Sequence, residues 1–156
     1  MNGNLRPNVW TGVVTFRDHS PEDETYVYKK LDLTTDIDKV MDDLCDIDAR
    51  GGGDGPEAVA DGLHIAVHDM DWSSDAMKVI FQIGDAPPHV FEGNGDSSFR
   101  QGYPLGYECR GETEQAAKLG ITIHTVGCSG IKDYNHGTDR RVQRDIKDHR
   151  WQIRTP

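Results

Sequence analysis

The sequence predicts a single α/β domain, and two patterns support this prediction. The segments Met77–Ile83 and Ile121–Val126 are short, nearly continuous apolar runs, which are typical of parallel strands covered on both faces. Segments with the periodicity of amphipathic helices separate such runs, and this alternation defines the α/β class. A chain of 156 residues is long enough for one domain and short for two. We therefore expect a doubly wound, mostly parallel sheet.

The N-terminal region predicts an antiparallel edge for that sheet. The run from Asn8 to Phe16 is rich in β-branched and apolar residues and ends at a polar cluster. The segment Thr25–Leu33 partly alternates apolar and polar side chains, and Lys29 and Lys30 protect such a strand against further pairing. The two segments are expected to pair as antiparallel strands, with the second at the edge.

Three helices are expected. The first follows Thr34 and Thr35, either of which can cap it, and it carries apolar residues at i, i+3, i+4 and i+7 counted from Ile37. The second helix follows a glycine-rich loop and places Pro56 at its first position. The third, Glu112–Leu119, ends before a glycine.

Charge and hydropathy exclude two classes of partner. With 27 acidic and 17 basic residues the formal net charge is -10, which repels the phosphates of nucleic acids. No apolar run approaches the roughly 18 residues that span a bilayer, and the N-terminus lacks the apolar core of a signal peptide. We expect neither nucleic-acid binding nor membrane insertion, and the cellular compartment stays open.

Acidic and imidazole side chains follow two of the predicted strands. Asp18 and His19 come after the first strand, and Asp85 and His89 come after the first apolar run. Ligands of α/β sheets bind outside the carboxyl ends of the strands, and the loop GGGDGPE is expected at the same edge. Residues 86–111, rich in Pro and Gly, form a long loop that we expect to rim a site there.

Three carboxylates in these loops, those of Asp54, Glu57 and Asp85, suit a hard divalent cation. Mg²⁺ prefers oxygen ligands and usually takes one or two protein carboxylates while it keeps several waters. The alternative is structural, since Asp54 is placed to cap the second helix and Asp85 to cap the next element. The residues alone leave both interpretations open.

The segments GGGDGPE, VIFQIGDAPPH and GITIHTVGCSG resemble, in order and spacing, a von Willebrand factor type A domain. The similarity runs from Val9 to Ile131 and implies an α/β fold with a metal-ion-dependent adhesion site. GGGDGPEAVADGL with GDAPPH is most similar to the branch of integrin β-subunit I-like, hemicentin-type and bacterial A domains, where a Glu replaces a threonine. The resemblance implies that Glu57 ligates the ion directly, that Asp85 does so directly or through water, and that Asp54 lies at the site or at a neighbouring cation position.

Two parts of the chain depart from the family pattern. The Asp-x-Ser-x-Ser motif, which follows a first central strand, has no counterpart upstream of Val9, so we expect that strand to be missing and the domain to be incomplete. From Ile131 onward the sequence carries seven Lys or Arg against four Asp and matches neither the last helix nor the last strand. We interpret residues 1–131 as a partial domain and 132–156 as a divergent basic tail.

The resemblance implies a noncatalytic domain for protein binding and cell adhesion. Its cation, Mg²⁺ or else Mn²⁺ or Ca²⁺, would be shared with an acidic residue of a protein partner, and binding would be weak without the two serines. The rim around that ligand would consist of Asp18, His19, Pro87 and His89. The alternative is a Mg²⁺-dependent enzyme that uses Asp85 as nucleophile or metal ligand, although no motif for a nucleotide or a general base accompanies it.

Two further groups are weaker candidates. His64 and His68 stand at i, i+4 on one helix and could clasp zinc, but without an evident third ligand a partly exposed helix face is the simpler interpretation. Cys109 and Cys128 could pair in an oxidising compartment, although ordinary thiols are expected.

Overall fold

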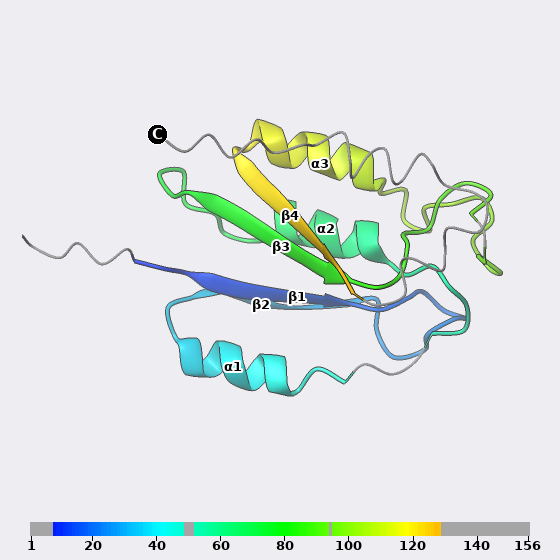
Figure 1. The fold of residues 1–156 in the computed structure, drawn as a ribbon, viewed down its shortest axis with the longest axis horizontal. Coiled ribbons are helices and arrows are strands. Elements are labelled where there is room, and N and C mark those ends of the chain that lie inside the picture. The colour runs from blue at the N-terminus through cyan, green and yellow to red at the C-terminus, as the bar shows by residue number, and fades with distance from the viewer. Residues whose placement is uncertain (1–7, 49–51, 94, 129–156) are drawn as a thin grey trace, which may run out of the picture.

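A computed structural model of the chain describes residues 8–48, 52–93 and 95–128 (Figure 1). The described part has mixed α/β structure with three helices and two separate two-stranded sheets. The α/β class is therefore confirmed, while the predicted tail at 132–156 lies outside the described residues. In chain order the elements are β1 (Thr11–Phe16), β2 (Tyr28–Thr34), α1 (Ile37–Cys45), α2 (Val59–His68), β3 (Lys78–Gly84), α3 (Cys109–Lys118) and β4 (Ile121–Gly127).

The first sheet is the predicted antiparallel pair. Strand β1 pairs with β2 from Thr11 opposite Thr34 to Phe16 opposite Tyr28. Strand β2 begins later than predicted because Asp23 holds the preceding segment in a turn, where its Oδ1 accepts a hydrogen bond from the Thr25 N–H at 2.7 Å.

The second sheet is the parallel pair of β3 and β4. The two strands align in register from Lys78 opposite Ile121 to Gly84 opposite Gly127. Among the described residues, β4 is the only strand that pairs with β3, and no ladder joins β3 to β1. The described strands therefore do not form the single, mostly parallel sheet that the sequence predicts.

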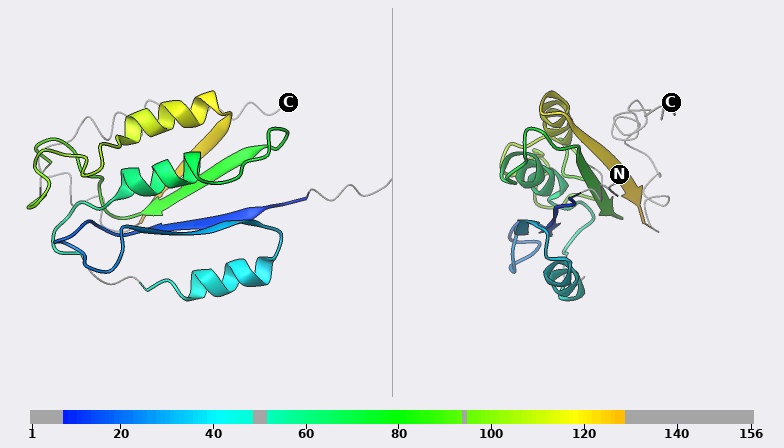
Figure 2. Two further views of the ribbon diagram at one scale, coloured as in Figure 1. Left: turned by 180° about the vertical axis from the view of Figure 1, so that it is seen from behind. Right: turned by 90° about the vertical axis from the view of Figure 1, so that its left-hand side faces the viewer.

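The core lies between the parallel pair and two helices. Helices α2 and α3 lie on the same face of β3 and β4, whereas α1 lies beyond the antiparallel pair (Figures 1 and 2). The partly buried residues Trp72, Ile80 and Ile123 pack against this core. Burying a Leu, Val or Ile side chain contributes roughly 1.5 to 3 kcal/mol, so this cluster is a main source of stability. The buried members of the cluster are Leu63, Val67, Ala116 and Ile121.

Among the described residues, no helix or strand covers the other face of the parallel pair, which corrects the prediction that both faces are covered. Phe81 is 66% exposed, Ile83 60% and Val126 47%. An apolar run shows that a strand is hydrophobic, but it does not show how many layers cover it. Here α2 and α3 cover the same face, and the side chains that alternate to the opposite face are left exposed.

Two predicted helix starts are wrong. The N-cap of α1 is Asp36, whose Oδ1 accepts a hydrogen bond from the Lys39 N–H at 3.1 Å, rather than Thr34 or Thr35. Helix α2 starts after Ala58, because the backbone of the preceding residues is bonded to neighbouring loops, so Pro56 is not its first residue. In both places a contact outside the local sequence pattern decides the start.

The apolar stripe of α1 and the start of α3 also differ from expectation. Val40 is 4% exposed, but Ile37 and Met41 are each more than half exposed, so the stripe packs at one position only. Helix α3 begins at Cys109, one turn before the predicted Glu112.

The described residues contain no helix that is both long and apolar enough to cross a bilayer. Cys45 and Cys128 are exposed, and the expectation of ordinary thiols stays a prediction.

Replacing Gly62 in α2 tests how closely this helix packs on β1. A Cβ at Gly62 would lie 2.5 Å from Cδ1 of Phe16, which is too close for two non-bonded carbon atoms. We expect Gly62→Ala to lower the free energy of unfolding by about 1 to 2 kcal/mol, because overpacking outweighs the better helix propensity of Ala. Urea denaturation measures this change.

Gly111 in α3 is the matched control, because a Cβ there meets nothing within 4 Å. Gly111→Ala should leave stability unchanged or raise it by up to about 1 kcal/mol. Equal effects at the two glycines would contradict the close packing of α2 on β1.

Candidate functional site

Three loops meet beyond the strand ends, as the sequence predicts. After β1, the carbonyl oxygen of Arg17 accepts a hydrogen bond from the Ala58 N–H at 2.8 Å. The N–H of Glu57 donates to the carbonyl oxygen of Pro87 at 2.9 Å, and Glu57 also forms an isolated parallel bridge with Pro88. The loop before α2 is therefore fixed between the loops that follow β1 and β3, which places Glu57 between them.

His89 lies at the centre of this edge and links two carboxylates. Its Nε2 is 2.6 Å from Oδ1 of Asp18, and its Nδ1 is 2.7 Å from Oδ2 of Asp96. All three side chains are almost fully buried. Burial alone lowers the pKa of His89, but the hydrogen bonds to the two carboxylates outweigh it and raise the pKa to about 9. At neutral pH the imidazolium therefore donates both N–H groups.

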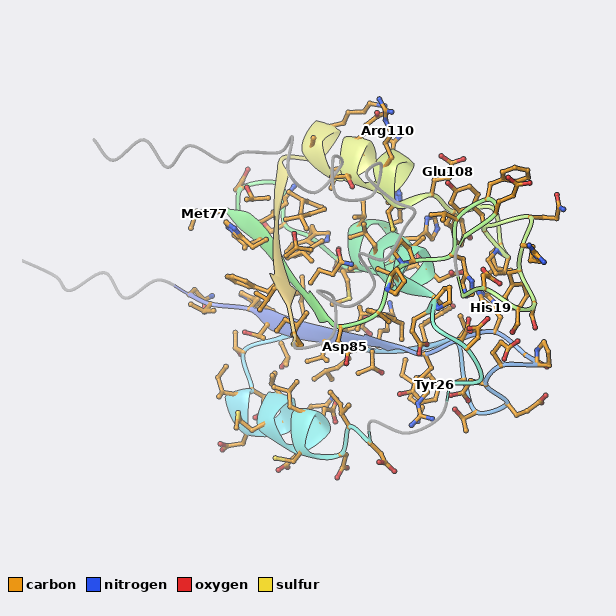
Figure 3. All side chains as sticks on the ribbon, turned by 45° about the vertical axis from the view of Figure 1, so that its right-hand side comes forward. His19, Tyr26, Met77, Asp85, Glu108 and Arg110 are labelled. Atoms are coloured by element: carbon orange, nitrogen blue, oxygen red, sulfur yellow. The ribbon has the colours of Figure 1, made fainter. Side chains whose placement is uncertain are left out.

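His19 and Phe99 pack around this buried group. Figure 3 shows His19 among the loops at one end of the molecule. Its Nε2 lies 3.3 Å from Oδ2 of Asp61 in α2. The Phe99 ring meets the rings of His19 and His89 edge-on, at centroid distances of 5.7 and 5.0 Å. The Phe99 N–H also donates to Asp96, which ties the long loop to this group, and both histidines are buried.

Glu57 carries the least compensated charge at this edge. Its burial, together with the negative charges of Asp18 and Asp23, raises the pKa of Glu57 to about 7. Asp54 adds to the effect, while its own Oδ2 accepts hydrogen bonds from the N–H and hydroxyl of Ser97 at 2.7 and 3.0 Å. Oδ2 of Asp18 and Oδ1 of Asp54 are buried and accept no hydrogen bond. The edge is therefore rich in acceptor oxygens.

The predicted site residues are brought together only in part. Glu57, Asp18 and Asp54 are close enough for their charges to interact, and Asp54 binds Ser97 instead of capping α2. Asp85 lies directly after β3 and is exposed (Figure 3). Its convergence with Glu57 on one ion stays a prediction.

Sequence reasoning missed Asp96, Phe99 and Asp61. The first two lie in the long loop, where no periodicity marks them. Both contact His89, whose other hydrogen-bond partner, Asp18, is 71 positions away in the sequence. The sequence did carry a signal for Asp61, because this carboxylate interrupts an apolar stretch between Ala60 and Gly62. In the structure Asp61 is 3% exposed.

A second group of polar side chains lies between α2 and α3. His64, His68 and Glu112 each offer a ligand atom, and these atoms lie within 4.8 Å of one another. Within the described residues this is the one group of three or more such side chains that could hold a metal ion. Glu112 supplies the third ligand that the histidine pair lacks in the sequence pattern.

No protein-family model matches this sequence, and a search of curated proteins finds no match either. The similarity to von Willebrand factor type A domains therefore rests on the three motifs and on nothing else.

The buried His89 makes stability depend on pH. Its folded pKa of about 9 lies above its ordinary 6.5, so its stabilising effect is complete below about pH 6.5 and is lost as the pH rises through 9. We expect the free energy of unfolding to fall between about pH 8 and pH 9.5, a window above most of the titration of Glu57, and urea denaturation at several pH values measures it.

His89→Gln keeps one donor but cannot titrate, so its stability should be lower at pH 7 and should fall less as the pH rises. His124→Gln, on the opposite side of the sheet where His124 stacks on Phe81, serves as control and should keep the full pH dependence. An unchanged pH dependence in His89→Gln would show that the imidazolium is not the titrating group.

Proposed function

We propose that the edge around Glu57 binds a divalent cation and that this cation holds an acidic residue of a protein partner, without catalysis. The observation that carries the proposal is the charge balance around Glu57. Its pKa of about 7 means that burial and the neighbouring negative charges oppose full ionisation of this carboxyl group. A cation would remove that resistance.

The positive groups of this edge are already paired. Arg17 forms an ion pair with Asp23 at 3.2 Å, and His89 pairs with Asp18 and Asp96. Glu57 and Asp54 have no such partner among the described positive groups of the edge. A bound cation would supply the missing charge, and the buried oxygens that accept no hydrogen bond would gain a water or an ion.

The ligand roles follow the resemblance to von Willebrand factor type A domains. Glu57 would bind the ion directly, Asp85 directly or through water, and Asp54 at the same or a neighbouring cation position. The free Oδ2 of Asp18 adds an acceptor for a water of the ion. Oxygen ligands of this kind favour Mg²⁺, Mn²⁺ or Ca²⁺.

A partner carboxylate fits the remaining coordination positions. A hard ion such as Mg²⁺ usually keeps several waters, which an external carboxylate can displace. Pro87, a half-buried residue of the rim, would then contact the partner, while the buried His19 and His89 hold the rim in place. The same openness makes binding of the ion alone weak.

Glu57 makes cation binding depend on pH. Its protonated form does not ligate, so the apparent affinity for Mg²⁺ should rise about tenfold between pH 6 and pH 8 as the group with a pKa of about 7 ionises. Isothermal titration calorimetry at several pH values measures this, with Mn²⁺ as a second probe.

Glu57→Gln should bind Mg²⁺ more weakly and lose the pH dependence. Glu114→Gln makes the same chemical change at an exposed position of α3 and should behave like the unmodified chain. His68→Ala should also leave Mg²⁺ binding unchanged, which separates this edge from the histidine pair. Mg²⁺ binding that Glu57→Gln does not weaken would refute the proposal.

A further inference from the structure

We infer that His64, His68 and Glu112 form a second metal site, specific for a borderline transition-metal ion such as Zn²⁺, which fastens α3 to α2. This site is separate from the carboxylate edge and does not rest on the function proposed for it. Its ligands come from two helices that the structure places side by side on one face of the parallel strands (Figure 2).

Helix geometry places the two histidines together. Residues four apart lie one above the other on a helix face, and the rings of His64 and His68 have centroids 4.6 Å apart. Tyr107 stacks on His64 with its centroid 3.8 Å away and its plane inclined by 10°, which fixes the orientation of that ring. One nitrogen of each histidine faces the neighbouring helix α3.

Glu112 completes the group from α3. Its Oε1 lies 3.2 Å from Nδ1 of His64, and its Oε2 lies 3.0 Å from Nε2 of His68. Glu112 is 8% exposed, so a carboxylate is buried against two imidazoles. Burial of a charge is costly unless it is paired, and a metal ion is one way to pair it.

The group is incompletely satisfied without an ion. Nδ1 of His64 is buried and has no hydrogen-bond partner, although a carboxylate oxygen is near it. A cation placed between this nitrogen and the carboxylate oxygen would bind both. Nδ1 of His64 and Oε1 of Glu112 are therefore suited to bind the same ion.

The ligand types select the metal. Two imidazole nitrogens and one carboxylate oxygen form a donor set that suits Zn²⁺, with bonds of about 2.0 to 2.2 Å, whereas Mg²⁺ and Ca²⁺ prefer oxygen alone. The three donor atoms lie within 4.8 Å of one another, so small side-chain rotations would close them around an ion. The side chains of His64 and His68 are 24% and 33% exposed, which gives the ion access and leaves a fourth position for water.

A metal ion at this site would cross-link α2 and α3. Helix α3 and strand β4 follow the long loop, and α2 is the helix that packs on them. An ion bound by both helices stabilises the folded chain in proportion to its affinity and concentration. Metal binding would thus stabilise the packing of the helices on the parallel strands.

The experiment measures thermal unfolding and metal spectra of the full chain. With excess Zn²⁺ we expect the Tm to rise by about 5 °C or more, and excess Mg²⁺ should not reproduce this rise. Co²⁺ should give the visible absorption of a low-coordinate nitrogen and oxygen site, and Zn²⁺ should displace it. No Tm shift with Zn²⁺ and no Co²⁺ absorption would overturn the inference.

Variants identify the ligands. His68→Ala, at the most exposed position of the three, should fold and should lower Zn²⁺ affinity by more than about 100-fold, since even outer contacts of metal sites contribute 10- to 100-fold. Glu112→Gln should have a similar effect on the Co²⁺ spectrum, and circular dichroism checks its folding.

His124→Ala and Glu57→Gln are the matched controls, because His124 stacks on Phe81 away from the group and Glu57 belongs to the carboxylate edge. Both should keep the full response to Zn²⁺. A response that persists in His68→Ala and Glu112→Gln would place the ion elsewhere and overturn the assignment. Loss of the response in Glu57→Gln alone would place the ion at the carboxylate edge.

Discussion

Helix α2 is the element on which the rest of the described structure depends. In the described chain no ladder joins the two strand pairs, so they are held together by side-chain packing on α2 and by the backbone bonds of Glu57 and Ala58 to the neighbouring loops. One face of α2 meets β1, where Gly62 lets Phe16 approach the helix backbone. Leu63 and Val67 pack toward the parallel strands. In a sheet with a continuous ladder, many backbone hydrogen bonds would connect the strand pairs. Here the connection depends on the ten-residue helix α2 and the residues just before it.

The same helix also organises both candidate sites. The residues before its first turn, Glu57 and Ala58, are tied by their N–H groups to the loops after β3 and β1. Its later turns present His64 and His68 to α3. The two candidate sites differ in their ligand types. Carboxylates dominate the loops before α2, and imidazoles dominate the face that its later turns present to α3. Asp18 and Asp96 share the single positive charge of His89, whereas the neighbouring negative charges raise the pKa of Glu57.

The features that the sequence predicts correctly are those with a local pattern. Apolar runs locate β3 and β4, helical spacing locates α1 and α2, and the glycine-rich loop marks the chain segment that carries Glu57. Features that depend on distant partners were not predictable in this way. The pairing of His89 with Asp18 spans 71 positions, and that of His68 with Glu112 spans 44. No periodicity encodes such contacts, and the number of layers over a strand likewise depends on tertiary packing.

The open side of β3 has a consequence for how the molecule behaves in solution. In the described chain one edge of β3 has no neighbouring strand, and Phe81 and Ile83 lie exposed beside it. Unpaired backbone groups next to apolar side chains are a template for strand addition. An added strand would gain a backbone ladder and an apolar surface in one step. At high concentration, a strand from another copy of this chain would therefore be a competent partner for that edge.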